Sequence, residues 1–419
     1  MLDNTGTRQL AYVVIIDKIL PIEGADRVEQ AVVGGWHIMT RKGQFKPGDA
    51  AIYFEIDSKV PETEPFKFLE SKHYKVKTQK YFKGTVISQG LLMSAEDFGW
   101  TVQVEPLGGV RTEVIIDDEG KPHYPDDESR FLTEKLGVKY AVDEDNVRKA
   151  ASADKYKKMA QRHGKLFSRQ PFRWLMKRDW GRKLLFIFFG KKKDSKTSFP
   201  THFPYVKKTD QERCENMPWI LKDKTPFIVT QKCDGSSGTY ILERKPRRKF
   251  EFYVCSRNVR QLTPDQKSFY EDNYYWECAI KYDIENKLKD YLKKHPDLTY
   301  VCWQGEVCSP KIQGNPQGLT ETHLFLFHMI DSVKGKYDIR DAATIWKEYG
   351  MEIVPIVCEN YILPDDFEEF KLSADGFYDS SCCEGKNKQS REGFVYYKTT
   401  DPNFSFKNVS RTYLLKHNN

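Results

Sequence analysis

The part of this sequence with the clearest chemical potential places a lysine, a carboxylate and a glycine within four residues. Lys232, Asp234 and Gly235 follow an apolar run at 226–230 and precede a second apolar run at 239–242. Two such runs around a short polar segment predict two strands joined by a tight turn, in which glycine allows a ligand to approach the backbone closely. The turn would present an amine and a carboxylate together.

A lysine in such a turn could act as a nucleophile toward phosphorus. An amine attacks only when it is deprotonated, so its pKa must fall from about 10.4 through desolvation or a nearby cation. The alternative interpretation is an ordinary polar hairpin turn. This four-residue pattern alone is a weak signal and does not decide between the two. The charged residues further along the chain decide between the two.

Three of those residues lie in apolar runs that predict strands. Glu306 interrupts the run 298–307, and Glu392 and Lys407 lie in two later runs. Burying an isolated charge is costly, so each needs a partner. Together with Lys232 and Asp234 they could converge on a nucleoside triphosphate and a divalent metal ion. Each taken singly could instead form an ordinary ion pair.

The order of these residues resembles the covalent nucleotidyltransferase superfamily, which includes the ATP-dependent polynucleotide ligases and the mRNA capping enzymes. The resemblance covers residues 200–419. Six segments carry it: 232–235 is similar to the lysine-bearing motif I, 256–258 to the following arginine-bearing motif, 305–306 to motif III, 325–330 to motif IIIa, 392–395 to motif IV and 406–407 to motif V.

This resemblance implies ATP as the cofactor, with Mg²⁺ or Mn²⁺ beside it, and a role for each matching residue. The implied roles are AMP-accepting nucleophile for Lys232, metal ligands for Asp234, Glu306 and Glu392, phosphate contacts for Lys407 and Arg257, adenine stacking for Phe327, outer-phosphate contact for Arg213, and nucleotide binding for Gly235. Phe327 could otherwise be a simple core residue, and Arg213 an ordinary surface arginine.

Within the superfamily the chain is most similar to ATP-dependent RNA ligases that carry an N-terminal OB-fold domain. DNA ligases and capping enzymes normally have an OB domain after motif V, and only 12 residues follow Lys407. The resemblance implies sealing of nicks between RNA 3′-OH and 5′-phosphate ends through lysyl-AMP and RNA-adenylate intermediates. Two positions depart from the pattern: Ser405 replaces a frequent second lysine, and His328 replaces the usual aspartate.

The predicted fold is α+β and has two domains separated by a linker. Short strands between 10 and 56 predict a small closed β-barrel over residues 1–110, and 84–91 is similar to part of an OB module. Residues 111–199 form an acidic and then basic linker region. Residues 200–419 are expected to form a nucleotidyltransferase domain of antiparallel sheets with flanking helices.

The charge of the chain is concentrated in the second part of that linker. Residues 155–193 carry 14 Lys and Arg but one acidic residue, whereas the whole chain has a net charge of +7. Such a segment, with aromatic residues among its lysines and arginines, favours a polyanionic partner, and we expect RNA or an RNA-containing nicked duplex. A spacer or a membrane-surface helix is the alternative. The lysines and aromatics of 72–83 suit stacking on bases in the same way.

Cysteine use and the N-terminus bear on where the protein works. Nine cysteines show no zinc-like spacing and predict reduced thiols, and the first residues lack the pattern of a signal peptide. We therefore expect a cytoplasmic or nuclear monomer that is not secreted and makes no membrane contact. Two other functions stay open on sequence grounds: a GTP-dependent mRNA capping guanylyltransferase, and a non-catalytic RNA-binding protein on the same scaffold.

Overall fold

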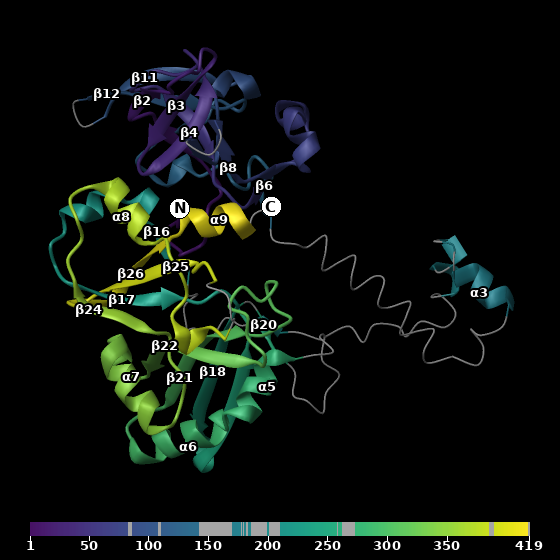
Figure 1. The fold of residues 1–419 in the computed structure, drawn as a ribbon, viewed down its shortest axis with the longest axis vertical. Coiled ribbons are helices and arrows are strands. Elements are labelled where there is room, and N and C mark those ends of the chain that lie inside the picture. The colour runs from purple at the N-terminus through teal and green to yellow at the C-terminus, as the bar shows by residue number, and fades with distance from the viewer. Residues whose placement is uncertain are drawn as a thin grey trace. The chain divides into compact units, whose positions relative to one another are not determined.

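The computed structural model describes most of the chain and divides it into two compact units (Figure 1). One unit comprises Met1–Lys139 and Ser198–Asn419, and the other comprises Tyr140–Thr197. The described residues are 1–82, 86–107, 110–141, 170–176, 178, 180–181, 183–185, 199–200, 210–257, 259–261, 273–384 and 389–417. The α+β fold is confirmed, because the first unit contains antiparallel sheets with a few flanking helices.

The N-terminal domain is built from short antiparallel strands around a central buried strand. That strand, β5, places Ile52 and Phe54 in one hydrophobic core and Ala51 and Tyr53 in another, as the alternation of side chains along a strand requires. The strands up to residue 93 are β1 Ala11–Ile15, β2 Lys18–Pro21, β3 Val28–Val33, β4 Trp36–Arg41, β5 Ala50–Phe54, β6 Ser58–Lys59, β7 Lys75–Val76, β8 Thr78–Tyr81, β9 Val86–Gln89 and β10 Leu91–Met93; the 3₁₀ helix η1 spans Glu64–Lys72.

The segment from residue 111 to residue 139 differs from the expected linker, because it packs on the N-terminal domain. β11 (Thr101–Leu107) and β12 (Val110–Ile116) form an antiparallel pair across the expected boundary at residue 110. Ile115, Leu132 and Val138 are buried in the same core as Ile52. The acidic composition concealed these and the also buried Val114, because so few apolar positions give no clear strand or helix pattern. Later short elements are η3 Ala95–Phe98, β13 Pro122–His123, η4 Glu128–Arg130 and β14 Lys139–Tyr140.

The C-terminal domain consists of two sheets that face each other. The seven-stranded sheet has the order β15-β20-β19-β18-β21-β22-β23, and the five-stranded sheet has the order β16-β26-β25-β17-β24. Their strands are β15 Phe199–Pro200, β16 Glu212–Arg213, β17 Phe227–Lys232, β18 Ser236–Lys245, β19 Lys249–Cys255, β20 Val259–Arg260, β21 Tyr300–Cys308, β22 His323–Asp331, β23 Gly335–Lys336, β24 Ile356–Tyr361, β25 Gly393–Lys398 and β26 Asp401–Val409.

Helices cover the outer faces of these sheets, and an apolar layer fills the space between them. Leu324 and Leu326 of β22 pack with the helices beneath the larger sheet, whereas Phe325 and Phe327 point to the layer that also contains Ile228 of β17. The helices are α5 Tyr274–Lys281, α6 Ile284–Lys294, α7 Ile339–Glu348, α8 Phe367–Ser373 and α9 Arg411–His417, with short η5 Cys214–Asn216, η6 Pro218–Lys222, η7 Pro246–Arg248 and η8 Ser380–Cys382.

The two strands around Lys232 do not form a hairpin, so this alternative interpretation is wrong. β17 pairs with β24 and β25 in one sheet, and β18 pairs with β19 and β21 in the other. The connection at 233–235 therefore crosses between the sheets. A Cβ atom on Gly235 would lie 2.4 Å from the carbonyl oxygen of Val307, so only glycine fits there.

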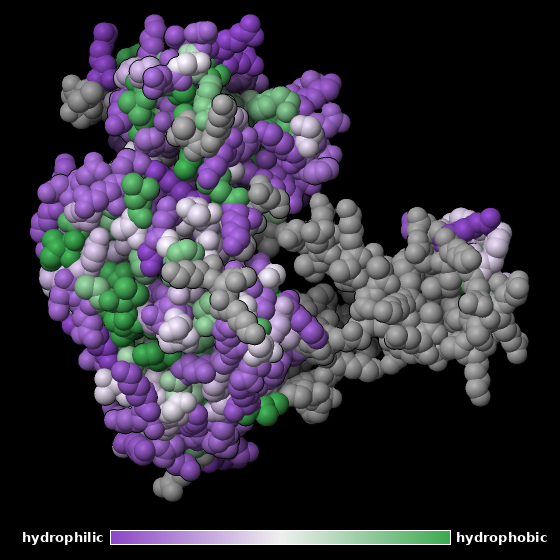
Figure 2. All heavy atoms as spheres, viewed as in Figure 1, coloured by the Kyte–Doolittle hydropathy of each residue, from purple (hydrophilic) through white to green (hydrophobic). Residues whose placement is uncertain are grey.

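The basic segment 155–193 lies largely outside the described residues. Within it, α3 (Gln170–Met176) carries the exposed Trp174, and the Arg178 guanidinium lies 3.7 Å from the centroid of this ring. Trp180 contacts Trp174 edge to face. Among the described residues, no helix is long and apolar enough to cross a membrane. Figure 2 shows mostly hydrophilic side chains, with small hydrophobic patches, on the visible face of the described residues.

Candidate active site

Lys232 lies at the end of β17, where its amine contacts a carboxylate carried by the next strand of the sheet. Its Nζ atom is 2.8 Å from Glu392, which directly precedes β25. The pairing of Lys232 with Gly393 fixes this contact. Gly393 has a φ of 145°, and a Cβ atom there would lie 2.1 Å from the carbonyl oxygen of Asn408. The close packing of these strands therefore requires a glycine beside Glu392.

Two more carboxylates act on the same amine from the facing sheet. Glu306 lies on β21 and accepts a hydrogen bond from the backbone N–H of Gly235, and Asp234 follows Lys232 in the crossing segment. Burial disfavours the charged amine, but Glu392, Glu306 and Asp234 outweigh it and raise the pKa of Lys232 above its ordinary value. The structure thus brings Lys232 and all three predicted metal ligands together.

The negative charges of the carboxylates are less well neutralised by their surroundings than the positive charge of the Lys232 amine. Burial raises the pKa of Glu306 to about 8, opposed by Lys232 and assisted by Glu392 and Asp234. Burial likewise raises the pKa of Glu392 to about 7. The pKa of Asp234 is also raised by burial, although Tyr413 and Lys232 counteract the shift. One amine cannot neutralise three buried acids, so this side of the site favours an additional cation.

Lys407 and Arg213 form a cationic group on the smaller sheet. β16 runs parallel to β26, and the register places Arg213 opposite Lys407. Burial, together with the positive charges of Arg8, Arg213 and Lys232, lowers the pKa of Lys407 to about 7. Arg213 is only 5% exposed and bonds Asp57 of the N-terminal domain at 3.1 Å. This side of the site favours an anion, for which phosphate is a suitable candidate.

Arg257 and Phe327 are placed differently from the central cluster. The Arg257 side chain is 45% exposed and pairs with Asp210, whose charge in turn acts on Lys407. Phe327 is buried between the sheets at a bulge in β22, and its ring lies 4.9 Å from that of His328. A bulge re-aims side chains, so it sets both rings toward the smaller sheet.

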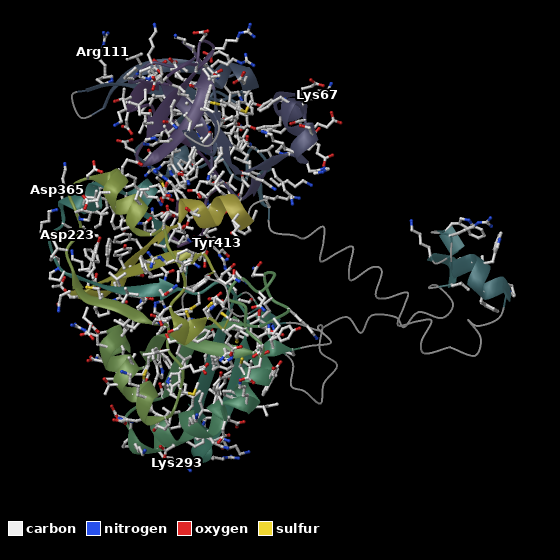
Figure 3. All side chains as sticks on the ribbon, viewed as in Figure 1. Lys67, Arg111, Asp223, Lys293, Asp365 and Tyr413 are labelled. Atoms are coloured by element: carbon white, nitrogen blue, oxygen red, sulfur yellow. The ribbon has the colours of Figure 1, made fainter. Side chains whose placement is uncertain are left out.

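Three residues near the site were not predicted. Tyr413 of α9 donates a hydrogen bond from its hydroxyl group to Asp234, and Figure 3 labels it on that helix. Tyr378 lies in the buried layer that contains Cys233. Lys371 of α8 is fully buried and bonds Glu215 at 2.7 Å, Asn408 at 2.8 Å and the Val409 carbonyl at 3.0 Å. None of the three belongs to a motif with recognisable spacing, so sequence patterns carried no signal for them.

The carboxylate cluster is compatible with a divalent cation bound together with a nucleotide. Its donors are hard oxygen atoms, and the raised pKa values of Glu306 and Glu392 report negative charge without enough compensation. Among the described residues, no three His, Cys, Asp or Glu side chains are placed to hold a metal ion by themselves. This fits Mg²⁺-type binding, in which one or two carboxylates combine with substrate phosphates and water.

The fold and this cluster are typical of a nucleotidyltransferase: a lysine lies at a sheet crossing, buried acids surround its amine, and cations lie on the adjacent strands. Comparison with known protein families identifies which type of nucleotidyltransferase the domains resemble. Residues 10–95 match an OB-fold domain model, and residues 225–410 match the RNA ligase family model. The chain therefore carries an RNA ligase domain preceded by an OB-fold domain.

Solved structures of an RNA ligase from Naegleria gruberi are similar to this chain over its full length. The Naegleria gruberi RNA ligase with pyrophosphate is 24% identical and has a TM-score of 0.65, and the similarity covers 98% of this chain and 99% of that one. A variant of that ligase with ATP and Mn is 24% identical, has a TM-score of 0.64, and the similarity covers 99% of both chains. Another variant, with AMP and Mn, is 25% identical, has a TM-score of 0.64, and the similarity covers 98% of this chain and 99% of that one. No curated protein matches the sequence.

Proposed function

We propose that this protein is an ATP-dependent ligase that joins RNA 3′-OH and 5′-phosphate ends through a covalent adenylate on Lys232. The observation that carries the proposal is the Lys232 amine, 2.8 Å from Glu392 and within the field of Glu306 and Asp234. The similar Naegleria gruberi ligase structures with ATP, AMP, pyrophosphate and Mn support this nucleotide and cation chemistry.

The reaction would run in three phosphoryl transfers that each need positioning and charge neutralisation. First, the Lys232 nitrogen bonds to the α-phosphorus of ATP while the bond to the β-phosphate oxygen breaks and pyrophosphate leaves. Second, an RNA 5′-phosphate oxygen attacks the same phosphorus, and the phosphorus–nitrogen bond breaks. Third, the RNA 3′-OH attacks the 5′-phosphorus and AMP leaves.

Lys232 must lose a proton before the first step. In the nucleotide-free protein the three acids hold its pKa high, so the amine is charged. A divalent cation bound at Asp234, Glu306 and Glu392, by one or two of them directly and otherwise through water, would offset the charge of these acids and lower the pKa of the lysine. Glu392 is the group in contact with the amine, and with a pKa of about 7 it can accept the proton.

The remaining predicted residues would bind the nucleotide and the RNA end. Lys407 and Arg213, side by side on β26 and β16, would contact phosphate oxygens, and Arg257 would assist from the rim. Phe327 would stack on adenine. The OB-fold domain and the basic segment 155–193 would hold an RNA-containing nicked duplex, a substrate that the resemblance to nick-sealing ligases favours.

The decisive experiment labels the protein itself. Protein incubated with Mn²⁺ and either α-labelled ATP or α-labelled GTP is expected to retain label from ATP only, and mass spectrometry should place one AMP on Lys232. Lys232→Ala should retain none, whereas Lys334→Ala, which removes an exposed lysine paired with Asp341, should behave as wild type. Label from GTP would indicate a guanylyltransferase, and no label from either nucleotide would indicate a non-catalytic RNA-binding protein.

A second experiment tests the substrate. Nicked duplexes in which each strand is switched between RNA and DNA should be sealed only when the 3′-OH strand ends in RNA. Deleting residues 155–193 should weaken RNA binding and reduce the slope of log affinity against log salt, because fewer cations are then released from the RNA. Self-adenylylation should persist in this deletion variant. An unchanged salt slope would contradict an RNA contact by this segment.

A further inference from the structure

Two buried tyrosine hydroxyl groups face the carboxylate side of the site. Tyr413, only 6% exposed, donates its hydroxyl hydrogen to Asp234. Tyr378 reaches the same region from the segment between α8 and η8: burial raises the pKa of its hydroxyl, and the nearby charges of Glu392 and Asp234 raise it further. Neither tyrosine belongs to a segment that resembles a nucleotidyltransferase motif.

The Tyr378 hydroxyl is the unusual member of this pair. The residue is only 8% exposed, and its oxygen atom has no hydrogen-bond partner among the described residues. A buried hydroxyl without a partner is destabilising, and most such groups in proteins are satisfied by protein or by ordered water. A buried, unpaired hydroxyl directed toward a binding site is therefore expected to have its partner in the bound state.

The segment that carries Tyr378 is held firmly in this position. Arg391, next to Glu392, donates to the backbone carbonyl groups of Ala374 at 2.9 Å and Ser373 at 3.1 Å. The carboxylate of Asp375 accepts the hydroxyl of Ser410 at 2.6 Å and the backbone N–H of Thr412 at 3.2 Å, which ties the segment to the start of α9. These hydrogen bonds therefore fix the backbone of the segments that carry Tyr378 and Tyr413.

Two further hydrogen bonds hold the segment on its other side. The backbone N–H of Tyr378 donates to the carbonyl oxygen of Gln389 at 2.9 Å, and the backbone N–H of Asp379 donates to the side chain of Gln231 at 2.9 Å. Gln231 directly precedes Lys232. These contacts restrict any backbone rotation that would move the Tyr378 hydroxyl away from the site. The hydroxyl should therefore find its partner in a ligand that binds there.

We infer that Tyr378 is a substrate-site residue whose hydroxyl bonds a water molecule of the divalent cation that enters with the nucleotide. This inference rests on the proposed function. The charged groups near the hydroxyl are Glu392 and Asp234, which only accept hydrogen bonds when ionised, whereas water in a cation's shell donates strongly. A tyrosine hydroxyl can accept from such a water and donate to an acid, so it can bridge the two. Tyr413 acts differently, as a positioning residue that holds Asp234.

The test compares Tyr378→Phe with Tyr349→Phe, a matched control. The hydroxyl of Tyr349 donates a hydrogen bond to Asp290 at 2.8 Å on the helices beneath the larger sheet. Tyr349→Phe therefore also removes a tyrosine hydroxyl that lies near a carboxylate, but far from the site. Mn²⁺ affinity is measured by the electron paramagnetic resonance signal of free Mn²⁺, with an ATP analogue that has a methylene group between the α- and β-phosphorus atoms. Thermal unfolding is measured without metal or nucleotide.

Tyr378→Phe is expected to weaken Mn²⁺ binding about fivefold, the equivalent of one ordinary hydrogen bond. Its melting temperature without ligand should stay the same or rise, because the variant removes a buried hydroxyl without a partner. Tyr349→Phe should melt at a lower temperature and bind Mn²⁺ as the wild type does. Unchanged Mn²⁺ affinity in Tyr378→Phe, or a lower melting temperature, would overturn the inference.

The same measurements separate this inference from the proposed function. If wild-type protein binds Mn²⁺ with the analogue and attaches AMP to Lys232, but Tyr378→Phe binds Mn²⁺ equally well, only the inference fails. If wild-type protein neither binds Mn²⁺ with the analogue nor attaches AMP, the proposed function fails as well.

Discussion

The acidic and basic sides of the site are opposite in charge but alike in their electrostatic cost. Burial and like charges raise the pKa of Glu306 and Glu392 on one side, and lower the pKa of Lys407 on the other. Lys232 lies between them and is compensated only by the acids. Each side therefore lacks the charge that the ligand would supply: a divalent cation for the acids and phosphate for the lysine and arginine.

These opposite charge deficits allow the site to be selective before any ligand is bound. Neither side is satisfied within the folded protein, so ligand binding should stabilise the fold as well as start the chemistry. A nucleotide with its cation satisfies both sides at once, whereas free phosphate or a free cation satisfies one. Each side can therefore be perturbed separately by substitution.

The largest effect is expected from Lys371, which supports the basic side from within the core. It is fully buried and bonds Glu215 and Asn408, the neighbours of the segments that carry Arg213 and Lys407. Lys371→Met leaves the Glu215 carboxylate buried without its partner, so the free energy of unfolding should fall by about 3–5 kcal/mol in urea titrations.

Two further variants test this explanation. Lys371→Met combined with Glu215→Leu should recover most of the loss, because no unpaired charge remains. Lys224→Met removes the lysine of an exposed pair with Asp365, labelled in Figure 3, and should cost less than about 1 kcal/mol. A double variant as unstable as the single one would show that packing, and not charge, makes Lys371 important.

The next largest effect concerns Lys407 itself. Lys407→Met should slow self-adenylylation about 10²–10³-fold, the usual result of removing one buried donor that stabilises a transition-state charge. Its ligand-free stability should not fall, because the variant removes a buried cation whose pKa is already depressed. Single-turnover labelling and urea unfolding measure the two quantities. Lys398→Met, which breaks a pair with Asp223 elsewhere on the same sheet, should leave the rate near wild type.

A smaller effect follows from the titration of the same residue. The pKa of Lys407 is about 7 in the folded protein and near 10.5 in the unfolded chain, so the unfolded chain binds more protons between these values. Stability should therefore rise with pH across this window, by up to about 1.4 kcal/mol for each pH unit. Urea unfolding at pH 7 and pH 9 should show a larger gain for wild type than for Lys407→Met. Equal gains would mean that Lys407 is charged normally.

The sequence was most informative where chemistry depends on residue order. Lys232, Glu306 and Glu392 were identified because they adjoin or interrupt apolar runs in an order that resembles the nucleotidyltransferase motifs, and the structure places them together. The α+β class and the OB fold were also predictable, because short strands leave a clear alternation. The nucleotide and metal roles of these residues stay predictions.

Other features depend on contacts that sequence patterns do not encode. Strands that are adjacent in the chain need not pair, and for this reason the segment around Lys232 was open to interpretation as a hairpin although it joins two sheets. Residues 111–139 looked like a linker because their few buried apolar residues were sparse among acids. Tyr378 and Lys371 act through tertiary contacts at long sequence separation, so no local spacing marked them.

The smallest effect is expected for Arg257, which distinguishes the rim of the basic side from its buried part. Its side chain is 45% exposed and already paired with Asp210, so Arg257→Ala should change stability by no more than about 0.5 kcal/mol. Self-adenylylation should slow by less than about tenfold, since a solvated cation contributes less than a buried one. The nearby Arg260→Ala, which removes a contact with the Tyr253 ring, serves as the control. A decrease as large as that of Lys407→Met would place Arg257 on the phosphate itself and extend the basic side to the surface.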